Sequence, residues 1–370
     1  SELYWDLAAV GIIADSAKLS DPEARYIINE GLANINNQFL RALVEAQAYS
    51  LKGKMNNTSI SFYIAPLINA VVRVGSKTDK IDMFRSFIED KELVDYTNKR
   101  TKETRKETIS VSMARRCKNL KAKQARIVTK ALDKILEELP EEAVENEKAI
   151  VYHGEFEDNL TGLIAMKVAG IYRRPTLIIH NDSDPNKTDV LKGSARNYDL
   201  NGIDNLKDIV NQTNDFEYAL GHQSAFGVSL NKKSVESIRV KLNKEFADYD
   251  FTEIYNVDFS IPADEFDKQL IFDICDYEDY WGKGVEEPFL HIKEIPLVEC
   301  EMSLLGKKSD TIAMEYDGVK YMIFKTDMDT YEKIKEESLF GSMDIIGKAN
   351  VNEYEGKKTP QIMIQDFEIN

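Results

Sequence analysis

The chain has 370 residues, 43% of them hydrophobic and 9% aromatic, which is enough to bury two or three separate cores and predicts several domains. It contains no run of about 18 apolar residues, and its first residues lack the order of a signal peptide, so we expect a cytoplasmic protein without a membrane segment. The three cysteines lie far apart and lack CxxC spacing, which argues against a disulfide framework and against a zinc site.

The charge of the chain is unevenly distributed. A formal net charge of −16 ordinarily counts against a nucleic-acid partner, because phosphate binding needs a basic surface. Between Lys99 and Lys130, however, twelve basic residues stand against two acids, a balance of +10 that leaves −26 for the rest of the chain. Such a run is usually a solvated helix face, but on an acidic protein this basic strip (residues 99–130) can also mark where a polyanion lies.

The first segment, residues 1–76, alternates helix-like and strand-like pieces. Its apolar run in VGIIADSAKL (residues 10–19) predicts a short buried strand that opens out at Asp15. Ligands bind at that edge of open α/β sheets, so Asp15 is a candidate site residue. The alternative is that Asp15 caps a helix or a turn.

Three further segments follow. Residues 77–145 are charged and nearly free of Gly and Pro, which predicts one or two long helices. Residues 146–258 alternate short β-rich runs with helical segments and predict a second α/β domain. Residues 259–370 begin with a helix and continue mainly as strands, with Asp317-Gly318 as a hairpin turn, which favours a five-stranded barrel of the OB type.

Two stretches carry residue pairs suited to phosphate. In PLINAVVRVG, Asn69 and Arg73 are four residues apart and share one face of a predicted helix, where an amide and a guanidinium can bind a phosphate oxygen. The alternative is that Arg73 pairs with a nearby acid at the end of the helix. In KGSARNYD, Ser194 and Arg196 alternate along a predicted strand and point to the same side.

A third stretch, ALGHQSAFGVSL, predicts a glycine-bounded turn. Gly221 and Gly227 flank a lone histidine, His222, so the backbone can bring N–H groups close to an anion. The alternative is a histidine that packs or caps.

These stretches and Asp15 occur in the order of a known family. Over nearly its whole length the chain resembles the RecJ single-strand-DNA exonucleases of the DHH phosphoesterase superfamily. DLAAVGIIADSAKL resembles the motif whose Asp is a metal ligand, and PLINAVVRVG resembles PRINAxxRxG, with Leu67 in place of the first Arg. KGSAR and LGHQSAFG resemble the KGSGR and GGHxxAAG signatures of the DHHA1 domain, the second of which differs at Leu220 and Phe226.

The resemblance implies an α/β multidomain fold. Its parts would be the C-terminal part of a DHH α/β domain (residues 1–76), a basic connector of long helices (77–145), a DHHA1 α/β domain (146–258), and a helix followed by an OB-like β-barrel (259–370). It also implies that Asp15 is a ligand of catalytic Mn²⁺ or Mg²⁺. The implied DNA- and phosphate-binding residues are Asn69, Arg73, Ser194, Arg196, Gly221 and His222.

The family's other metal ligands belong to DxD and DHH motifs upstream of the residue that matches Asp15. Here only fourteen residues precede Asp15, and the four histidines include no adjacent pair. We therefore expect the catalytic residues on a missing N-terminal segment, which is absent from the gene, removed by a protease, or present as a separate polypeptide.

The sequence thus predicts a RecJ-like 5′-to-3′ exonuclease that hydrolyses single-stranded DNA with two metal ions. This chain would carry the DNA-binding part and one metal ligand, and would cut poorly or not at all alone. The alternative is a non-catalytic single-strand-binding or replication scaffold of the same architecture. A small-nucleotide phosphodiesterase of the superfamily is disfavoured by the connector and the barrel.

Overall fold

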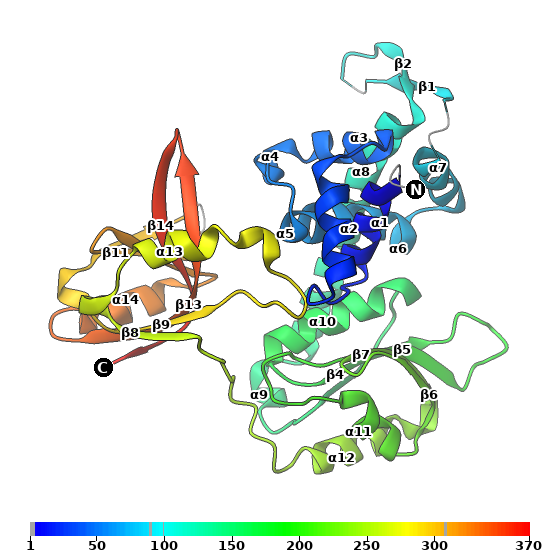
Figure 1. Cartoon of the computed structure of the whole chain (residues 1–370). Helices are drawn as coiled ribbons and strands as arrows, with labels where there is room; N and C mark the ends of the chain where they lie inside the picture. Colours follow the sequence, from blue (N-terminus) through cyan, green and yellow to red (C-terminus); the bar gives the residue numbers. More distant parts are fainter. Residues whose placement is uncertain (1–3, 89–90, 99, 307–308) are drawn as a thin grey trace. The chain divides into compact units, whose positions relative to one another are not determined.

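The computed structural model describes residues 4–88, 91–98, 100–306 and 309–370, so Lys99 of the basic strip lies outside the described residues. Two compact units divide the chain (Figure 1). The first unit consists of Ser1–Leu40, Gln47–Ala65 and Tyr255–Asn370, and the second unit consists of Arg41–Ala46 and Pro66–Ile254. No helix among the described residues is long and apolar enough to cross a membrane.

The N-terminal part of the first unit is helical. Its elements are α1 (Trp5–Ala14), α2 (Pro22–Ala33), the beginning of α3 (Gln38–Ala46), α4 (Ala48–Leu51), α5 (Asn57–Ser59) and the π-helical turn η2 (Ile60–Ile64). The buried carboxylate of Asp6 accepts hydrogen bonds from the backbone N–H groups of Asn36 and Asn37, at 2.8 and 2.7 Å. This contact fixes the chain where it turns from α2 into α3.

The apolar run that we predicted as a strand is helical, so that prediction is wrong. Residues 10–14 belong to α1, and its buried residues Ala9, Val10 and Ile13 follow the spacing of one helix face. A short apolar run fits a buried strand and a buried helix equally well, and the packing of α1 against α2 decides between them.

The C-terminal part of the first unit is a seven-stranded sheet in the order β10-β11-β12-β14-β13-β9-β8. The strands are β8 (Phe259–Pro262), β9 (Phe289–Pro296), β10 (Glu301–Leu305), β11 (Thr311–Tyr316), β12 (Val319–Phe324), β13 (Ser342–Tyr354) and β14 (Lys357–Ile369). The helical elements are η5 (Ala263–Glu265), α13 (Gln269–Cys275), η6 (Glu278–Tyr280), η7 (Leu297–Glu299) and α14 (Met328–Glu337).

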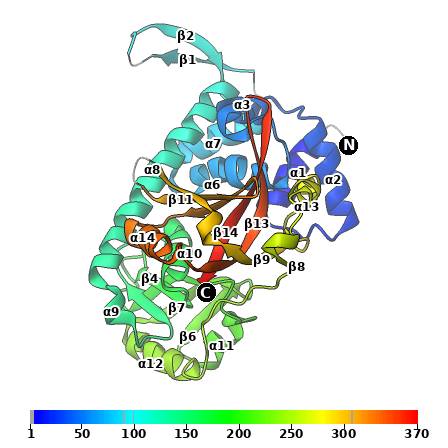
Figure 2. The same ribbon diagram turned by 90° about the vertical axis from the view of Figure 1, so that its left-hand side faces the viewer.

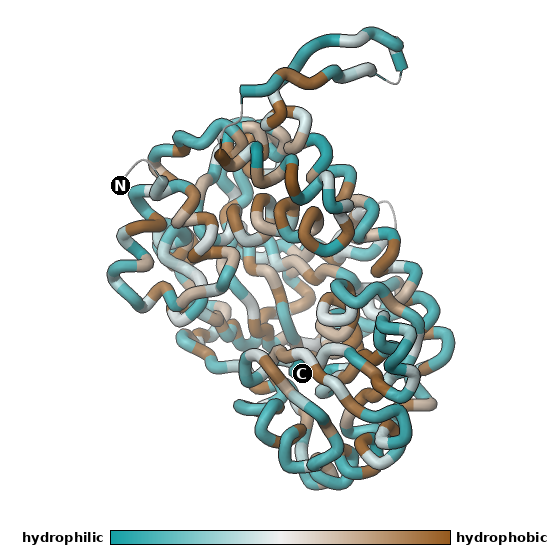
Figure 3. The backbone as a smooth tube through the Cα atoms, turned by 90° about the vertical axis from the view of Figure 1, so that its right-hand side faces the viewer, coloured by the Kyte–Doolittle hydropathy of each residue, from teal (hydrophilic) through white to brown (hydrophobic). Residues whose placement is uncertain are grey.

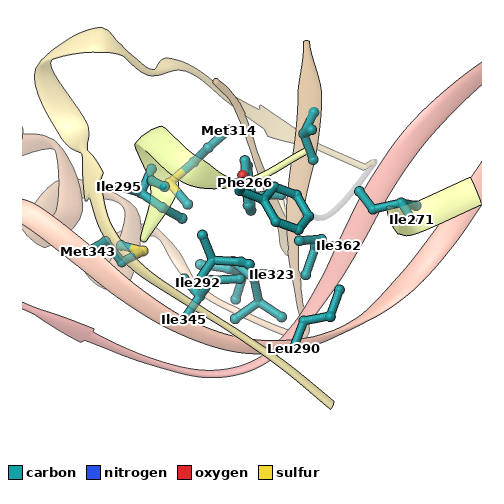
Figure 4. Packing of buried hydrophobic residues seen from close by; sticks show 14 of the residues in the cluster. Phe266, Ile271, Leu290, Ile292, Ile295, Met314, Ile323, Met343, Ile345 and Ile362 are labelled. Carbon is teal, nitrogen blue, oxygen red and sulfur yellow. The ribbon is translucent and has the colours of Figure 1, made fainter. Parts of the chain in front are cut away.

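This sheet has two strands more than the predicted five, because β8 and β10 also pair with it. The predicted turn at Asp317-Gly318 is confirmed: both residues have positive φ, and Tyr316 pairs directly with Val319. A core of Phe, Ile, Leu and Met side chains from the sheet, α13 and α14 holds this part together (Figure 4).

The second unit contains the end of α3 (Arg41–Ala46), followed by α6 (Ala65–Val74, of which Ala65 lies in the first unit) and α7 (Lys77–Phe87). A hairpin of β1 (Leu93–Thr97) and β2 (Thr104–Thr108) then leads into the 30-residue helix α8 (Ile109–Glu138), which is followed by the short α9 (Glu141–Val144) (Figure 2). We predicted only helices for this stretch, and the hairpin corrects that prediction. Its strands are mostly polar and carry no apolar alternation that would identify them.

The rest of the second unit is a five-stranded sheet in the order β3-β4-β5-β7-β6. Its strands are β3 (Ile150–His153), β4 (Thr176–Asn181), β5 (Val190–Arg196), β6 (Phe216–Gly221) and β7 (Ala225–Asn231). Its helical elements are η3 (Asp158–Leu160), α10 (Thr161–Tyr172), α11 (Leu206–Gln212), η4 (Lys232–Ser234) and α12 (Val235–Glu245).

The helices cover the two faces of this sheet differently. Helices α11 and α12 contribute Leu206, Val210, Ile238 and Leu242 to one core with the sheet. The α10 crossover between the parallel strands β3 and β4 packs against β4 and β5, and its buried residues do not belong to that core. Alternate residues of β5 therefore face α10, and this side of the sheet holds the candidate site.

Candidate nucleic-acid interface

Helix α6 carries two of the predicted site residues, Asn69 and Arg73, and both are half-buried. The helix follows directly on η2, a π-helical turn of the kind that is frequent at functional sites. It ends at Gly75, where a Cβ atom would lie 2.4 Å from the carbonyl oxygen of Val71, so only glycine fits. Leu67, the departure from the family motif, is buried in the core and presents no charge.

Helix α8 is fixed against α7 by a buried carboxylate. Asp79 of α7 accepts two hydrogen bonds from the Arg116 guanidinium of α8, at 2.7 Å from Nε and 3.2 Å from Nη2. Asp79 also forms a capping box with Ser76 at the start of α7. The hydrogen bond from Arg116 is the main reason why the pKa of Asp79 falls to about 2. This pair joins α7 to α8.

The predicted pair on β5 lies on one side of that strand, as the alternation in the sequence predicts. Ser194 and Arg196 both face the N-terminus of α10: the Ser194 hydroxyl lies 3.0 Å from that of Thr161, and a Cβ atom on Gly162 would lie 2.4 Å from Nη2 of Arg196. Arg196 donates a hydrogen bond of 2.7 Å from Nη1 to the carbonyl oxygen of Ala195. A guanidinium, hydroxyl groups and the first N–H groups of a 12-residue helix thus point into one place, an arrangement suited to an anion.

Four basic side chains from distant parts of the chain lie near one another around this place. We call Arg73, Lys121, Lys167 and Arg196 the cation cluster. Burial lowers the pKa of Lys121, and the charges of Arg73 and Lys167 lower it further. Burial and the charge of Arg73 likewise lower the pKa of Arg196, and burial lowers the pKa of Arg73 itself.

Within the described residues, the cation cluster has no acid as an ion-pair partner. The hydrogen bonds of the Arg196 guanidinium go to backbone carbonyl groups, at Ala195 and at Phe226. The carboxylate of Asp158, which precedes α10, contacts His180 and Ser183. Partly buried charges of one sign repel one another and lose solvation, so an added polyanion is the ligand that relieves both costs.

The predicted glycine turn joins β6 to β7 beside this site. Gly221 has φ of +141°, and a Cβ atom there would lie 2.8 Å from the carbonyl oxygen of Ala225. Ala225 in turn pairs with Arg196 across β7 and β5, so the turn lies at the same end of the sheet as the guanidinium. His222 is exposed, and its ring forms no hydrogen bond or ion pair with other described residues, which disfavours a packed or capping histidine.

The sequence reasoning identified only part of the cation cluster. Arg73 and Arg196 were predicted from motifs, and Lys121 was counted only as one charge of the basic strip. Lys167 lies on α10 outside every motif that we considered, and one lysine in an apolar helix gives no signal of its own. Its proximity to Lys121 depends on the packing of α10 against α8.

Asp15 lies at the C-cap of α1 in the first unit, with an exposed side chain. The carboxylate caps neither a helix nor a turn there, since the contacts at this position involve its backbone N–H group. The described residues contain no group of three or more His, Cys, Asp or Glu side chains that could hold a metal ion. One exposed carboxylate does not make a divalent-metal site, so the described part of the chain does not by itself form the Mn²⁺ or Mg²⁺ centre that the resemblance implies.

Comparisons with known proteins agree with this layout. A family model of the RecJ OB domain matches residues 257–366. The SPβ prophage-derived protein YorK of Bacillus subtilis (strain 168), named as a candidate single-strand DNA-specific exonuclease, is 37% identical over 373 residues, which cover 100% of this chain and 65% of YorK. The single-stranded-DNA-specific exonuclease RecJ of the same strain is 26% identical over 379 residues, which cover 98% of this chain and 43% of RecJ.

The crystal structure of RecJ from Thermus thermophilus in complex with Mn²⁺ has the same fold, with a TM-score of 0.75 at 21% sequence identity over 100% of this chain and 50% of that one. The molecule is therefore an α/β multidomain protein with the fold of RecJ, and residues 257–366 form its OB part. The chain is thus related in sequence to YorK and RecJ, which carry the names of single-strand DNA-specific exonucleases, and its residues 257–366 match the RecJ OB domain. It spans 65% of the length of YorK and 43% of the length of B. subtilis RecJ.

Proposed function

We propose that this chain is the strand-holding part of a RecJ-like exonuclease that degrades single-stranded DNA from 5′ to 3′. The cation cluster carries the proposal. Arg73, Lys121 and Arg196 have pKa values lowered by burial, and none has an acid partner among the described residues. A phosphodiester backbone supplies the missing negative charge at each nucleotide.

A single strand fits these groups better than a duplex. The guanidinium groups of Arg73 and Arg196 are half-buried, and a flexible single backbone can reach them more closely than a stiff double helix can. Ser194 and Thr161 add hydroxyl donors beside Arg196, while His222 and the turn at Gly221 border the same end of the sheet. In this proposal Asn69 of α6 adds an amide on the helix face of Arg73.

The OB-type part of the first unit offers the second kind of contact that single strands use, namely stacking of bases on aromatic rings. Several aromatic side chains there are at least 44% exposed: Tyr277, Tyr280, Phe324, Phe340 and Tyr354. Stacking tolerates any base because every base has a π face, and this suits an enzyme that degrades strands of any sequence.

For the whole enzyme we propose two-metal hydrolysis with Mn²⁺ or Mg²⁺, and we propose Asp15 as one ligand. The described residues contribute no complete metal site, so the other ligands have to come from elsewhere in the enzyme, either from the same polypeptide or from a separate one. We therefore expect this chain alone to bind single-stranded DNA without degrading it.

Binding of a 5′-labelled oligonucleotide, followed by fluorescence anisotropy in EDTA, tests the strand-holding role. The double variant R73Q/R196Q removes two charges of the cation cluster while it keeps both side chains polar. We expect its affinity to fall by at least about tenfold, since hydrogen bonds to charged groups are each worth about 1.5–3 kcal/mol. The control K232Q/K233Q removes two exposed lysines of η4 in the same unit and should bind like the unaltered chain.

The catalytic half of the proposal needs a second measurement, namely Mn²⁺-dependent degradation of the same oligonucleotide by this chain and by the product of the full reading frame. Degradation by the longer product alone supports a nuclease whose metal site is completed outside the described residues. If the longer product binds the strand but leaves it intact, a non-catalytic binding scaffold replaces the exonuclease. Equal binding by R73Q/R196Q and the control would remove the cation cluster from the interface.

A further inference from the structure

The hairpin of β1 and β2 contains none of the residues to which the proposed function gives a role. It projects beyond the N-terminal end of α8 in the second unit (Figure 1, Figure 2). Five residues of each strand pair in register, from Leu93 opposite Thr108 to Thr97 opposite Thr104. The pairs toward its outer end are polar: Asp95 binds Lys106 at 2.9 Å, and the hydroxyl groups of Thr97 and Thr104 lie 2.8 Å apart.

Isolated two-stranded hairpins are marginally stable in water, so this one needs an anchor. Arg115 of α8 provides it, because its guanidinium lies 2.5 Å from the buried carboxylate of Glu107 and 3.7 Å from the centre of the Tyr96 ring. Arg105 covers the same ring at 5.4 Å, directly across the two strands. Thr108 joins β2 to α8 without a loop and caps the helix with its hydroxyl oxygen. The hairpin is therefore anchored to α8.

The outer end of the hairpin carries unpaired positive charge. Arg100 and Lys102 are exposed, and neither forms an ion pair with another described residue. Figure 3 shows hydrophilic residues at this end. Two acids of the hairpin have partners other than Arg100 and Lys102. Asp95 binds Lys106, and Glu103 accepts a hydrogen bond from the hydroxyl group of Thr101. A polyanion is the partner that this charge pattern complements.

The form of the hairpin identifies the kind of polyanion. Its only aromatic ring, Tyr96, already has guanidinium groups at 3.7 and 5.4 Å from its centre, so it is engaged within the protein and not free to stack on a base as single-strand-binding surfaces require. A two-stranded β-ribbon has the width of the DNA major groove, and cations at its end reach the phosphates that border the groove. We propose that this hairpin binds the phosphate backbone of a duplex that adjoins the single-stranded substrate.

The spacing agrees with such a substrate. Lys121 lies twelve residues beyond Ile109 on α8, which is about 18 Å along the helix axis, and a five-residue strand adds at most about 17 Å. The end of the hairpin thus lies up to about 35 Å from the cation cluster, close to the length of one turn of B-DNA. A strand held at the cluster could continue into a duplex that rests on the hairpin.

The test compares three labelled DNA probes in EDTA: a single strand, a blunt duplex of about two turns, and that duplex with a 5′ single-stranded tail of about 12 nucleotides, long enough for an OB-type site. The variant R100E/K102E reverses two charges that take no part in the anchor at Tyr96 and Glu107. The matched control K232E/K233E reverses two exposed lysines on another part of the second unit.

We expect R100E/K102E to bind the tailed duplex about tenfold more weakly, as for the loss of two surface ion contacts, and to bind the single strand unchanged. The slope of log K against log salt for the tailed duplex should become shallower by about 2, because two phosphate contacts are lost. The control should leave all three affinities within about twofold, as expected for charges outside an interface.

Two outcomes would overturn the inference. Unchanged affinity of R100E/K102E for the tailed duplex would show that the hairpin does not touch it, and an equal loss for the single strand would show that the charges act on the strand instead. The inference rests on the proposed function, because the tail is expected to reach the cation cluster. Failure of that function shows separately, as absent binding of the single strand by the unaltered chain.

Discussion

The ion pair between Asp79 and Arg116 gives a sharp prediction about how the second unit holds its shape. The pKa of Asp79 falls from 3.8 to about 2, mainly through the hydrogen bond from Arg116. At about 1.4 kcal/mol per pKa unit this shift corresponds to at most about 2.4 kcal/mol of folding free energy. Arg116 is 52% exposed and screened by water, so we expect about 1–2 kcal/mol for the substitution D79N.

The pH dependence has a definite sign. Because the pKa of Asp79 is lower in the folded chain than in the unfolded chain, its contribution is complete above about pH 4 and disappears as the pH falls to about 2. The difference in unfolding free energy between D79N and the unaltered chain should therefore be constant at neutral pH and shrink on acidification. Urea denaturation followed by far-UV circular dichroism measures it. Tryptophan fluorescence would report the other unit, since Trp5 and Trp281 both lie there.

Helix α7 offers a matched control. Asp82 pairs with Arg85 at 3.6 Å on the exposed side of the same helix, and D82N should cost less than about 0.5 kcal/mol. Hydrogen exchange of peptides from α7 and α8 localises the effect to the second unit. If D79N costs no more than D82N, or if its cost persists unchanged down to about pH 3, the electrostatic account of this contact is wrong.

Two pairs of glycine substitutions and one thiol reaction test the site and the fold. G162A places a Cβ atom 2.4 Å from Nη2 of Arg196 and should weaken oligonucleotide binding about tenfold, whereas G170A, in open space on the same helix, should leave binding unchanged and raise stability by up to about 1 kcal/mol. G193A brings a Cβ atom within 2.1 Å of the carbonyl oxygen of Ile178 and should cost about 2 kcal/mol or more in thermal or urea unfolding, while G227A, with its nearest neighbour at 3.8 Å, should cost less than about 1 kcal/mol. Burial raises the pKa of Cys117 to about 12 and those of Cys275 and Cys300 to about 11, so all three native thiols should react with DTNB at neutral pH at least about a hundredfold more slowly than free cysteine and at the normal rate in urea.

Local chemistry let the sequence predict several elements correctly. The two positive-φ residues of a tight hairpin favour Asp-Gly, so Asp317-Gly318 marked the turn between β11 and β12. A long stretch without Gly or Pro and rich in Lys, Ala and Leu marked α8. The alternation in KGSARNYD placed Ser194 and Arg196 on one side of β5, because side chains of a strand alternate between its faces. In each case the deciding interaction lies within a few residues.

Other features were decided by contacts between distant residues. The run VGIIA is a helix because Val10 and Ile13 pack against neighbouring helices, a choice that a short apolar run leaves open. The hairpin at β1 and β2 exists because Arg115 holds it from α8.

The cation cluster is the clearest example of a feature that depends on contacts between distant residues. Its members Arg73, Lys121, Lys167 and Arg196 come from α6, α8, α10 and β5, and only the packing of these elements brings their charges together. The sequence by itself predicted the relationship to RecJ and two members of the cation cluster, Arg73 and Arg196. Tertiary structure decided which of those residues lose their solvent and lack an acid partner, because burial and charge proximity depend on segments that are far apart in the chain.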